Sequence, residues 1–125
     1  MLFRSVRSVL ASDLSTVETA SPTVHSTAVT PEVAAQLTAM MESVVTDGTG
    51  TAAQMSGVQV AGKTGTAQHA PGAAPHAWFI SFAPANDPTV AVAVVVEEGG
   101  NAGDQASGGR TAAPIAKAIM QAVLQ

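Results

Sequence analysis

Apolar residues recur at helical spacing in two stretches of the chain, residues 30–48 and residues 110–125. In the first stretch, Thr30 can cap the helix, Pro31 suits the first helical position and Gly48 suits its end. The apolar stripe of this stretch consists of Val33, Leu37, Met40, Met41, Val44 and Val45. In the second stretch the residues that share a face are Ile115, Ile119, Ala122 and Val123. The pattern predicts two helices.

Three stretches between these helices have patterns typical of strands, residues 58–68, 77–85 and 89–98. The short turn at residues 86–88 makes the last two an antiparallel hairpin. We therefore predict an α/β fold of the α+β type. It has an antiparallel three-stranded sheet, a helix on its N-terminal side and a C-terminal helix, one of which covers a sheet face. Residues 1–29 lack helical periodicity, and we expect an extended segment there.

Alternation along the middle strand separates two sets of side chains. Trp78, Ile80 and Phe82 fall on one face, and Phe79 and Ser81 fall on the other. We expect Trp78, the single tryptophan, to belong to the strand core. The third strand is apolar on both faces, which predicts a central or covered position in the sheet.

Composition removes several classes of function. The 125-residue chain is long enough for one domain, and its net charge of -4 with only five Lys and Arg residues argues against nucleic-acid binding. The longest apolar run, residues 90–96, is too short to span a bilayer, and the first residues do not form a signal peptide. There is no cysteine, so neither disulfides nor thiolate sites are possible. Only 3% of residues are aromatic, which predicts a core of small aliphatic side chains.

Residues 57–64, "GVQVAGKT", match the phosphate-binding pattern G-x-x-x-x-G-K-[ST]. That pattern requires a buried strand before the loop and a helix that begins at its lysine. Here the preceding residues are a polar loop, and residues 65–75 contain two prolines and cannot begin a helix. A P-loop nucleotide site is therefore the least favoured interpretation.

The same lysine begins "KTGT", residues 63–66, in the middle of the first predicted strand. Glycine weakens a strand interior and commonly marks the close approach of another backbone. A cation, two hydroxyls and a bare backbone at Gly65 suit an extended peptide that carries a carboxylate and adds along the strand edge.

The residues around this motif resemble a known family. "VQVAGKTGTAQ" is similar to the third active-site motif of class B penicillin-binding proteins, the serine D,D-transpeptidases that cross-link peptidoglycan. Residues 40–68 resemble the helix, loop and strand that lead through this motif. Residues 76–100 resemble the hairpin that follows, and residues 108–124 the closing helix. The resemblance covers residues 30–125, and residues 8–29 more faintly.

The resemblance implies roles for four residues. Lys63 would supply positive charge for proton transfer and for the anionic substrate, and Thr64 and Thr66 would bind the substrate carboxylate. Gly65 would let the substrate backbone approach, and the N–H of Thr66 would be an oxyanion-hole donor. The catalytic residues expected on this basis are Lys63 and Thr66. Strict alternation places the two threonines on one face of the strand and Lys63 on the other.

The resemblance also implies partners and a location. The ligand would be the D-Ala-D-Ala end of a stem peptide, or a β-lactam in its place, on the cell-wall side of the membrane. No cofactor or metal is expected. The family's S-x-x-K motif is absent, because Val60 and Pro114 stand three residues before the two lysines. Its S-x-N motif is also absent, because Pro84 and Gly99 stand two residues before the two asparagines. We therefore interpret residues 30–125 as the C-terminal portion of a transpeptidase domain that is inactive alone, with Met1 as an artificial start. The rest of the parent domain is then a required partner.

A stand-alone module that binds a peptide carboxylate is the alternative hypothesis. His25, His69 and His76 match no metal-ligand spacing, and we expect solvated or capping roles, with His69 at the rim of the cleft. Arg110 could serve a cleft or cap the preceding loop, and we expect the capping role.

Overall fold

The computed structural model describes residues 8–21, 24 and 26–124. Residues 1–30 and 31–125 form two separate units. In the first unit, β1 (Ser8–Leu10) and β2 (Thr16–Thr19) form an antiparallel hairpin. The Asp13 carboxylate accepts hydrogen bonds from the hydroxyl and the N–H of Ser15, at 2.6 and 3.0 Å. These bonds favour the charged form, the hydroxyl bond most, and hold the pKa of Asp13 below its usual value.

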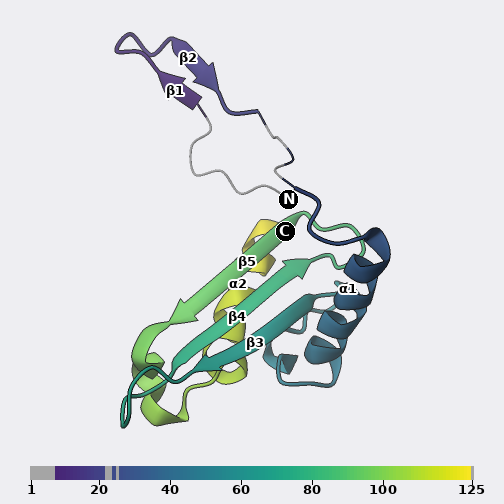
Figure 1. Cartoon of the computed structure of the whole chain (residues 1–125), viewed down its shortest axis with the longest axis vertical. Coiled ribbons are helices and arrows are strands. Elements are labelled where there is room, and N and C mark those ends of the chain that lie inside the picture. Colours follow the sequence, from purple (N-terminus) through teal and green to yellow (C-terminus); the bar gives the residue numbers. More distant parts are fainter. Residues whose placement is uncertain (1–7, 22–23, 25, 125) are drawn as a thin grey trace. The chain divides into compact units, whose positions relative to one another are not determined.

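The second unit contains the predicted order of a helix, three strands and a helix. These are α1 (Pro31–Thr46), β3 (Ala61–Ala67), β4 (His76–Ala83), β5 (Val90–Val96) and α2 (Ala113–Leu124). The strands form one antiparallel sheet in the order β3-β4-β5 (Figure 1). Short helical turns occur at Thr51–Ala53, Glu97–Gln105 and Gly108–Ala112. The predicted fold class is confirmed.

The two faces of the sheet differ in how they are covered. Helix α2 packs behind β4 and β5, where Phe79, Ser81 and Val94 are buried (Figure 1). Helix α1 packs against β3, and on the opposite face Ala61 is buried, whereas Trp78 and Ile80 remain 43% and 49% exposed. The expectation that Trp78 belongs to the core is therefore wrong. Alternation assigns these side chains to the correct faces, but it cannot tell which of two apolar faces α2 covers.

Strand β5 is an edge strand, whereas its apolar sequence predicted a central or covered one. It pairs only with β4 in the described part of the chain. Val90 and Val94 are buried, and Val95 is 43% exposed on the face that carries Trp78. Both faces of β5 are apolar, but within this chain only one of them is packed against other residues.

Helix α2 contacts the sheet through small residues. Ala113, Ala116 and Met120 are fully buried, whereas the predicted face is exposed, with Ile115 at 44% and Ile119 at 42%. Alanines let the helix approach the strands closely, and the Ser81 hydroxyl lies 3.5 Å from the Met120 sulfur. The prediction of the packed face was wrong, because the larger aliphatic side chains point elsewhere. In α1 only Val45 of the predicted stripe is fully buried.

Phe79 is the largest buried side chain, and glycine positions surround its ring. A Cβ built on Gly62 would lie 2.5 Å from Phe79 Cζ, and one on Gly50 would lie 3.2 Å from Phe79 Cε2. The ring therefore fills space that two missing side chains leave. The remaining core consists of alanine, valine and methionine side chains, as the composition predicts.

Replacing Phe79 by alanine tests this account of the core. We expect a loss of about 3–5 kcal/mol in the free energy of unfolding, because the cavity is bounded by backbone that cannot collapse. Ile80→Ala, one residue along the same strand on the bare face, should cost less than about 1 kcal/mol. Urea unfolding followed by far-UV circular dichroism measures both. Equal midpoints for the two variants would contradict the assignment of the packed face.

Candidate functional site

The KTGT motif lies on the edge strand of the sheet. Residues 63–66 fall within β3, which pairs with β4 on one side and with no other described strand. Strand β3 continues through Lys63 and Thr64 to Ala67, so no helix begins at the lysine. Gly57 has a φ of 76° in a tight turn closed by a bridge between Met55 and Val58. The geometry of a P-loop is therefore absent.

The motif presents different groups on the two faces of β3. Thr64 pairs with Phe79 and Thr66 with Ala77, whereas Lys63 pairs with Ile80. Strict alternation is kept, so the threonines share the packed side and Lys63 belongs to the bare side. The long Lys63 side chain turns back along the strand, and its ammonium donates to the Thr64 carbonyl at 2.8 Å.

Thr64 and Thr66 line an open pocket of about 520 Å³. The other lining residues come from two loops, and they are Thr49, Thr51, Ala52, Ser107, Gly108, Gly109 and Arg110. The hydroxyl oxygens of Thr49 and Thr64 are 2.7 Å apart and hydrogen-bonded. The pocket combines several hydroxyl groups with a single charged side chain, which is a cation. This combination suits an anionic ligand.

The loop at residues 107–110 reaches β3 because it contains two glycines. A Cβ on Gly108 would collide with the Trp78 carbonyl and with the backbone of Gly65, and one on Gly109 would collide with the Thr49 carbonyl. The backbone that approaches Gly65 within this chain is therefore that of Gly108. On the other side of the strand, a Cβ on Gly65 would lie 3.2 Å from Trp78 Cβ.

Arg110 lines the pocket, whereas the sequence favours a loop-capping role for it over a role in a cleft. Its backbone N–H donates to the Ser107 hydroxyl at 3.3 Å, so Ser107 rather than the Arg110 side chain caps the turn. Among the described residues the guanidinium has no hydrogen bond or ion pair. Thr49 and Ser107 were also missed. The available signal was the pair of glycine-rich sequences around them, "GTG" and "SGGR", which permit close backbone packing.

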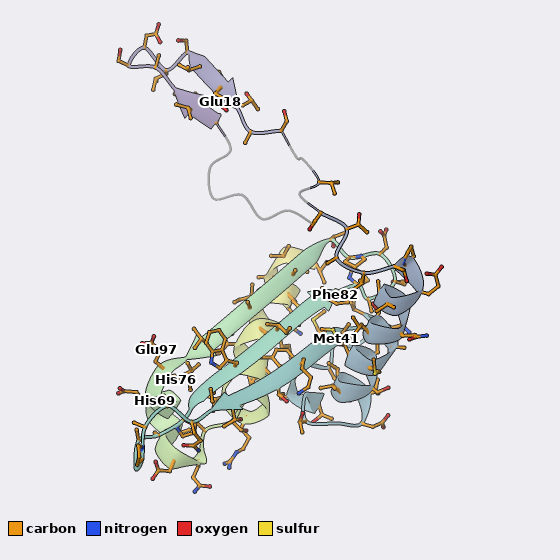
Figure 2. All side chains as sticks on the ribbon, viewed as in Figure 1. Glu18, Met41, His69, His76, Phe82 and Glu97 are labelled. Carbon is orange, nitrogen blue, oxygen red and sulfur yellow. The ribbon has the colours of Figure 1, made fainter. Side chains whose placement is uncertain are left out.

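The two described histidines interact with each other at the β3–β4 connection. Their rings stack with centroids 4.1 Å apart, and Figure 2 shows His69 and His76 side by side. His76 Nδ1 accepts the N–H of Glu98 at 2.9 Å. His25 lies outside the described residues. Within the described ranges no three potential metal ligands cluster together.

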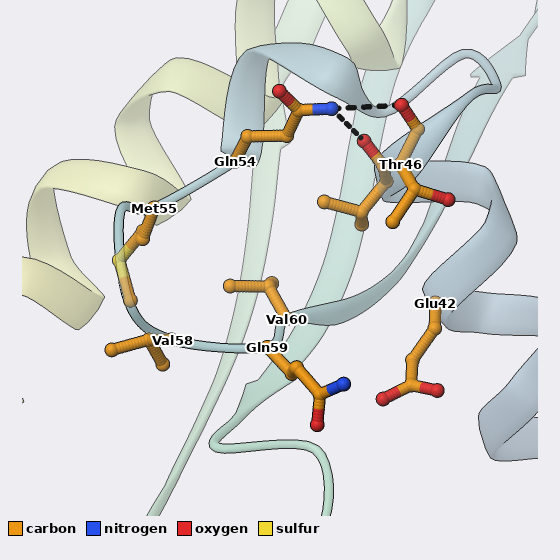
Figure 3. Close-up of a pocket in the computed structure, with 8 residues that line it drawn as sticks. Glu42, Thr46, Gln54, Met55, Val58, Gln59 and Val60 are labelled. Atoms are coloured by element: carbon orange, nitrogen blue, oxygen red, sulfur yellow. Dashed lines mark hydrogen bonds between the residues drawn. The ribbon is translucent and has the colours of Figure 1, made fainter.

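A second pocket of about 290 Å³ lies between the end of α1 and the start of β3 (Figure 3). Its lining is formed by Glu42, Val45, Thr46, Gln54, Met55, Val58, Gln59 and Val60. The Gln54 amide donates to the carbonyls of Val45 and Thr46 at 2.9 and 2.8 Å, and so ends α1 (Figure 3). No residue of the KTGT motif contributes to this pocket.

The fold and the KTGT edge strand define a class of protein, the penicillin-binding transpeptidases. Residues 4–121 match the family model of the penicillin-binding protein transpeptidase domain, and the chain belongs to this family. It is 48% identical over 125 residues to the peptidoglycan D,D-transpeptidase PbpA of Mycolicibacterium smegmatis. It is 40% identical over 111 residues to the stage V sporulation protein D of Bacillus subtilis. The predicted family is confirmed.

Solved structures agree with this assignment. A ceftriaxone acyl-enzyme complex of penicillin-binding protein A from M. tuberculosis superposes with a TM-score of 0.86 at 43% identity. That match covers 95% of this chain and 27% of the other. The D,D-transpeptidase domain of an Eggerthella lenta peptidoglycan glycosyltransferase gives a TM-score of 0.73 at 36% identity, over 94% of this chain and 27% of that one.

The chain spans a fraction of its relatives. The match to M. smegmatis PbpA covers 96% of this chain and 25% of the relative, and the match to the sporulation protein covers 85% and 17%. In the described ranges, no helix combines the length and the apolar character that a membrane crossing requires.

Gly108→Ala tests whether the glycine loop fixes the pocket. The added methyl meets backbone atoms that cannot move aside, so we expect a loss of about 1–3 kcal/mol in stability. We also expect shifted amide resonances at Gly65 and Trp78. Gly72→Ala is the control, because open space surrounds that position and its φ of 73° costs about 1–2 kcal/mol from the backbone alone. Unchanged Gly65 and Trp78 resonances in Gly108→Ala would count against the close packing.

Proposed function

We propose that this chain is the C-terminal part of a class B penicillin-binding transpeptidase domain and forms one wall of its acyl-transfer site. The wall would bind the D-Ala-D-Ala end of a stem peptide, or a β-lactam in its place. The serine nucleophile would come from a segment outside this chain. Since the M. smegmatis relative PbpA is a peptidoglycan D,D-transpeptidase, the site would work on the cell-wall side of the membrane.

The open edge of β3 is the observation that carries this proposal. In an antiparallel strand, alternate residues direct both their N–H and C=O groups to the same side. The Thr64 carbonyl is available to the Lys63 ammonium, which indicates that Thr64 faces the open edge. Two residues further along, the N–H of Thr66 is then directed to that edge as well. An extended peptide can pair there, and the Thr66 N–H can stabilise an oxyanion.

The four motif residues take distinct roles in this proposal. Lys63 would place positive charge beside the reacting serine and take part in proton transfer. Thr64 and Thr66 would hydrogen-bond the carboxylate of the ligand from the pocket side. Gly65 would keep the edge free of a side chain where the ligand backbone lies.

Uncovered apolar surfaces support the need for a partner segment. Trp78, Ile80 and Val95 are each more than 40% exposed on the bare sheet face. On α2, Ile115 and Ile119 are exposed to a similar extent. Contiguous apolar surface of this kind is typical of an interface. We propose that the part of the transpeptidase domain that lies outside this chain covers the sheet face.

Reconstitution tests the proposed activity. The chain would be co-expressed with the preceding transpeptidase segment of M. smegmatis PbpA, and the complex would be treated with a fluorescent penicillin. We expect covalent label on the PbpA segment only when this chain is present. Lys63→Ala should slow labelling by about 100-fold or more, because charge and proton transfer at the serine are lost.

Lys117→Ala in the same complex is the matched control, since it removes the other lysine without touching the motif. Its labelling rate should stay within about twofold of the unmodified chain. Label on this chain alone under native conditions would falsify the division of the site between two segments. Absence of label in a stable complex would overturn the proposed activity.

Trp78 supplies an optical test of the partner surface. It is the only tryptophan, so its emission reports on the bare face alone if the PbpA segment is made without tryptophan. We expect a blue shift on complex formation, because the indole passes from solvent to a packed interface. Val95→Glu should weaken association by at least about tenfold, since it buries a charge beside Trp78, away from Lys63. Emission that does not change on binding would exclude this face as the interface.

A stand-alone module that binds a peptide carboxylate is a second candidate. It is favoured by the pocket beside Thr64 and Thr66, which residues of this chain line by themselves. A soluble monomer that melts in one sharp, reversible transition and never associates with the PbpA segment would favour the module over the domain wall.

A further inference from the structure

Two cations lie near the KTGT strand, and the structure separates their positions. Lys63 belongs to the bare face of β3, and its ammonium is already hydrogen-bonded to the Thr64 carbonyl. Arg110 comes from the loop on the packed side and lines the pocket with Thr64 and Thr66. A ligand group inside this pocket would therefore meet Arg110 rather than Lys63.

Some polar groups of the pocket already have hydrogen-bond partners within the chain, and others do not. The Thr64 hydroxyl is paired with that of Thr49, and the Ser107 hydroxyl accepts the Arg110 N–H. The Thr66 hydroxyl and the Arg110 guanidinium have no hydrogen-bond partner among the described residues. No acidic side chain lines the pocket, so nothing within it neutralises the guanidinium.

These observations lead to a specific role for one residue. We propose that Arg110 is a binding residue that pairs with the ligand carboxylate, together with the Thr66 hydroxyl. The guanidinium presents a planar fork of N–H donors that matches the two oxygens of a carboxylate, which a lysine ammonium cannot do. This inference rests on the proposed function for the identity of the ligand. It assigns the carboxylate charge to Arg110 and leaves Lys63 for the reacting serine.

The role of Arg110 has a consequence for specificity. A ligand with a free C-terminal carboxylate should bind more tightly than the same ligand with a neutral amide, and the difference should depend on Arg110. The Gly108–Gly109 backbone holds the loop against β3 and Thr49, so the base of the arginine is fixed relative to the strand. Substitution of Arg110 should therefore remove the discrimination without altering the strand.

The experiment compares N-acetyl-D-alanyl-D-alanine with its C-terminal amide on the full 125-residue chain. Amide chemical shifts of the chain are followed during each titration. We expect the acid to bind at least about tenfold more tightly than the amide. Arg110→Gln should lower the affinity for the acid by about tenfold and leave that for the amide within about twofold. Inorganic phosphate, added as a competitor, distinguishes a general oxyanion site from one shaped for a carboxylate.

Lys117→Gln is the matched control, because it removes the same charge from α2 and does not line the pocket. It should keep the preference for the acid. The inference is wrong if Arg110→Gln keeps that preference, if Lys117→Gln loses it equally, or if the chain binds neither ligand. Thr66→Val should reduce binding of the acid by a smaller factor than Arg110→Gln.

The two proposals fail in different ways. If the reconstituted complex is labelled by penicillin and Arg110→Gln is labelled at the unmodified rate, the transpeptidase proposal stands and the role of Arg110 is overturned. If the complex is never labelled while the chain prefers the acid through Arg110, the binding site stands and the catalytic proposal fails.

Discussion

The packing of one aromatic ring against bare backbone is the constraint on which the rest of the structure depends. Phe79 lies on the central strand, and Gly62 and Gly50 leave the space that its ring fills. Gly62 immediately precedes the KTGT motif, so the same contact that builds the core fixes where the motif begins. With few aromatic residues available, the remaining core uses alanines that bring α2 close to the sheet.

That close packing divides the sheet into a covered face and a bare one. On the covered face, the glycine loop that precedes α2 lies directly against β3. This contact brings together the residues that line one pocket, among them Thr64, Thr66, Ser107 and Arg110. The bare face carries Lys63 together with Trp78 and Ile80. The two cations of the site thus have different surroundings, one beside apolar surface and the other among hydroxyl groups, and this difference underlies the separate roles that we propose for them.

Much of the fold could be predicted from local pattern. Alternation and helical spacing identified the strands and helices of residues 31–124, and the short turn between β4 and β5 predicted their pairing. The packed faces were not predictable in the same way, because both faces of β4 and β5 and more than one side of α2 are apolar. Whether Trp78 or Phe79 is buried depends on which face of the sheet the alanines of α2 approach. That contact joins residues far apart in the chain.

For the site, the sequence by itself determined the KTGT strand, its glycine and the resemblance to penicillin-binding transpeptidases. These features are formed by residues that are contiguous in the chain, so they can be identified from the sequence alone. Only the tertiary structure decided that Arg110 and Ser107 lie beside Thr66, and that Gly108 is the residue whose backbone approaches Gly65. The physical reason is that these contacts join segments more than 40 residues apart. They are made by backbone atoms, so the pattern of side chains along the chain does not predict them.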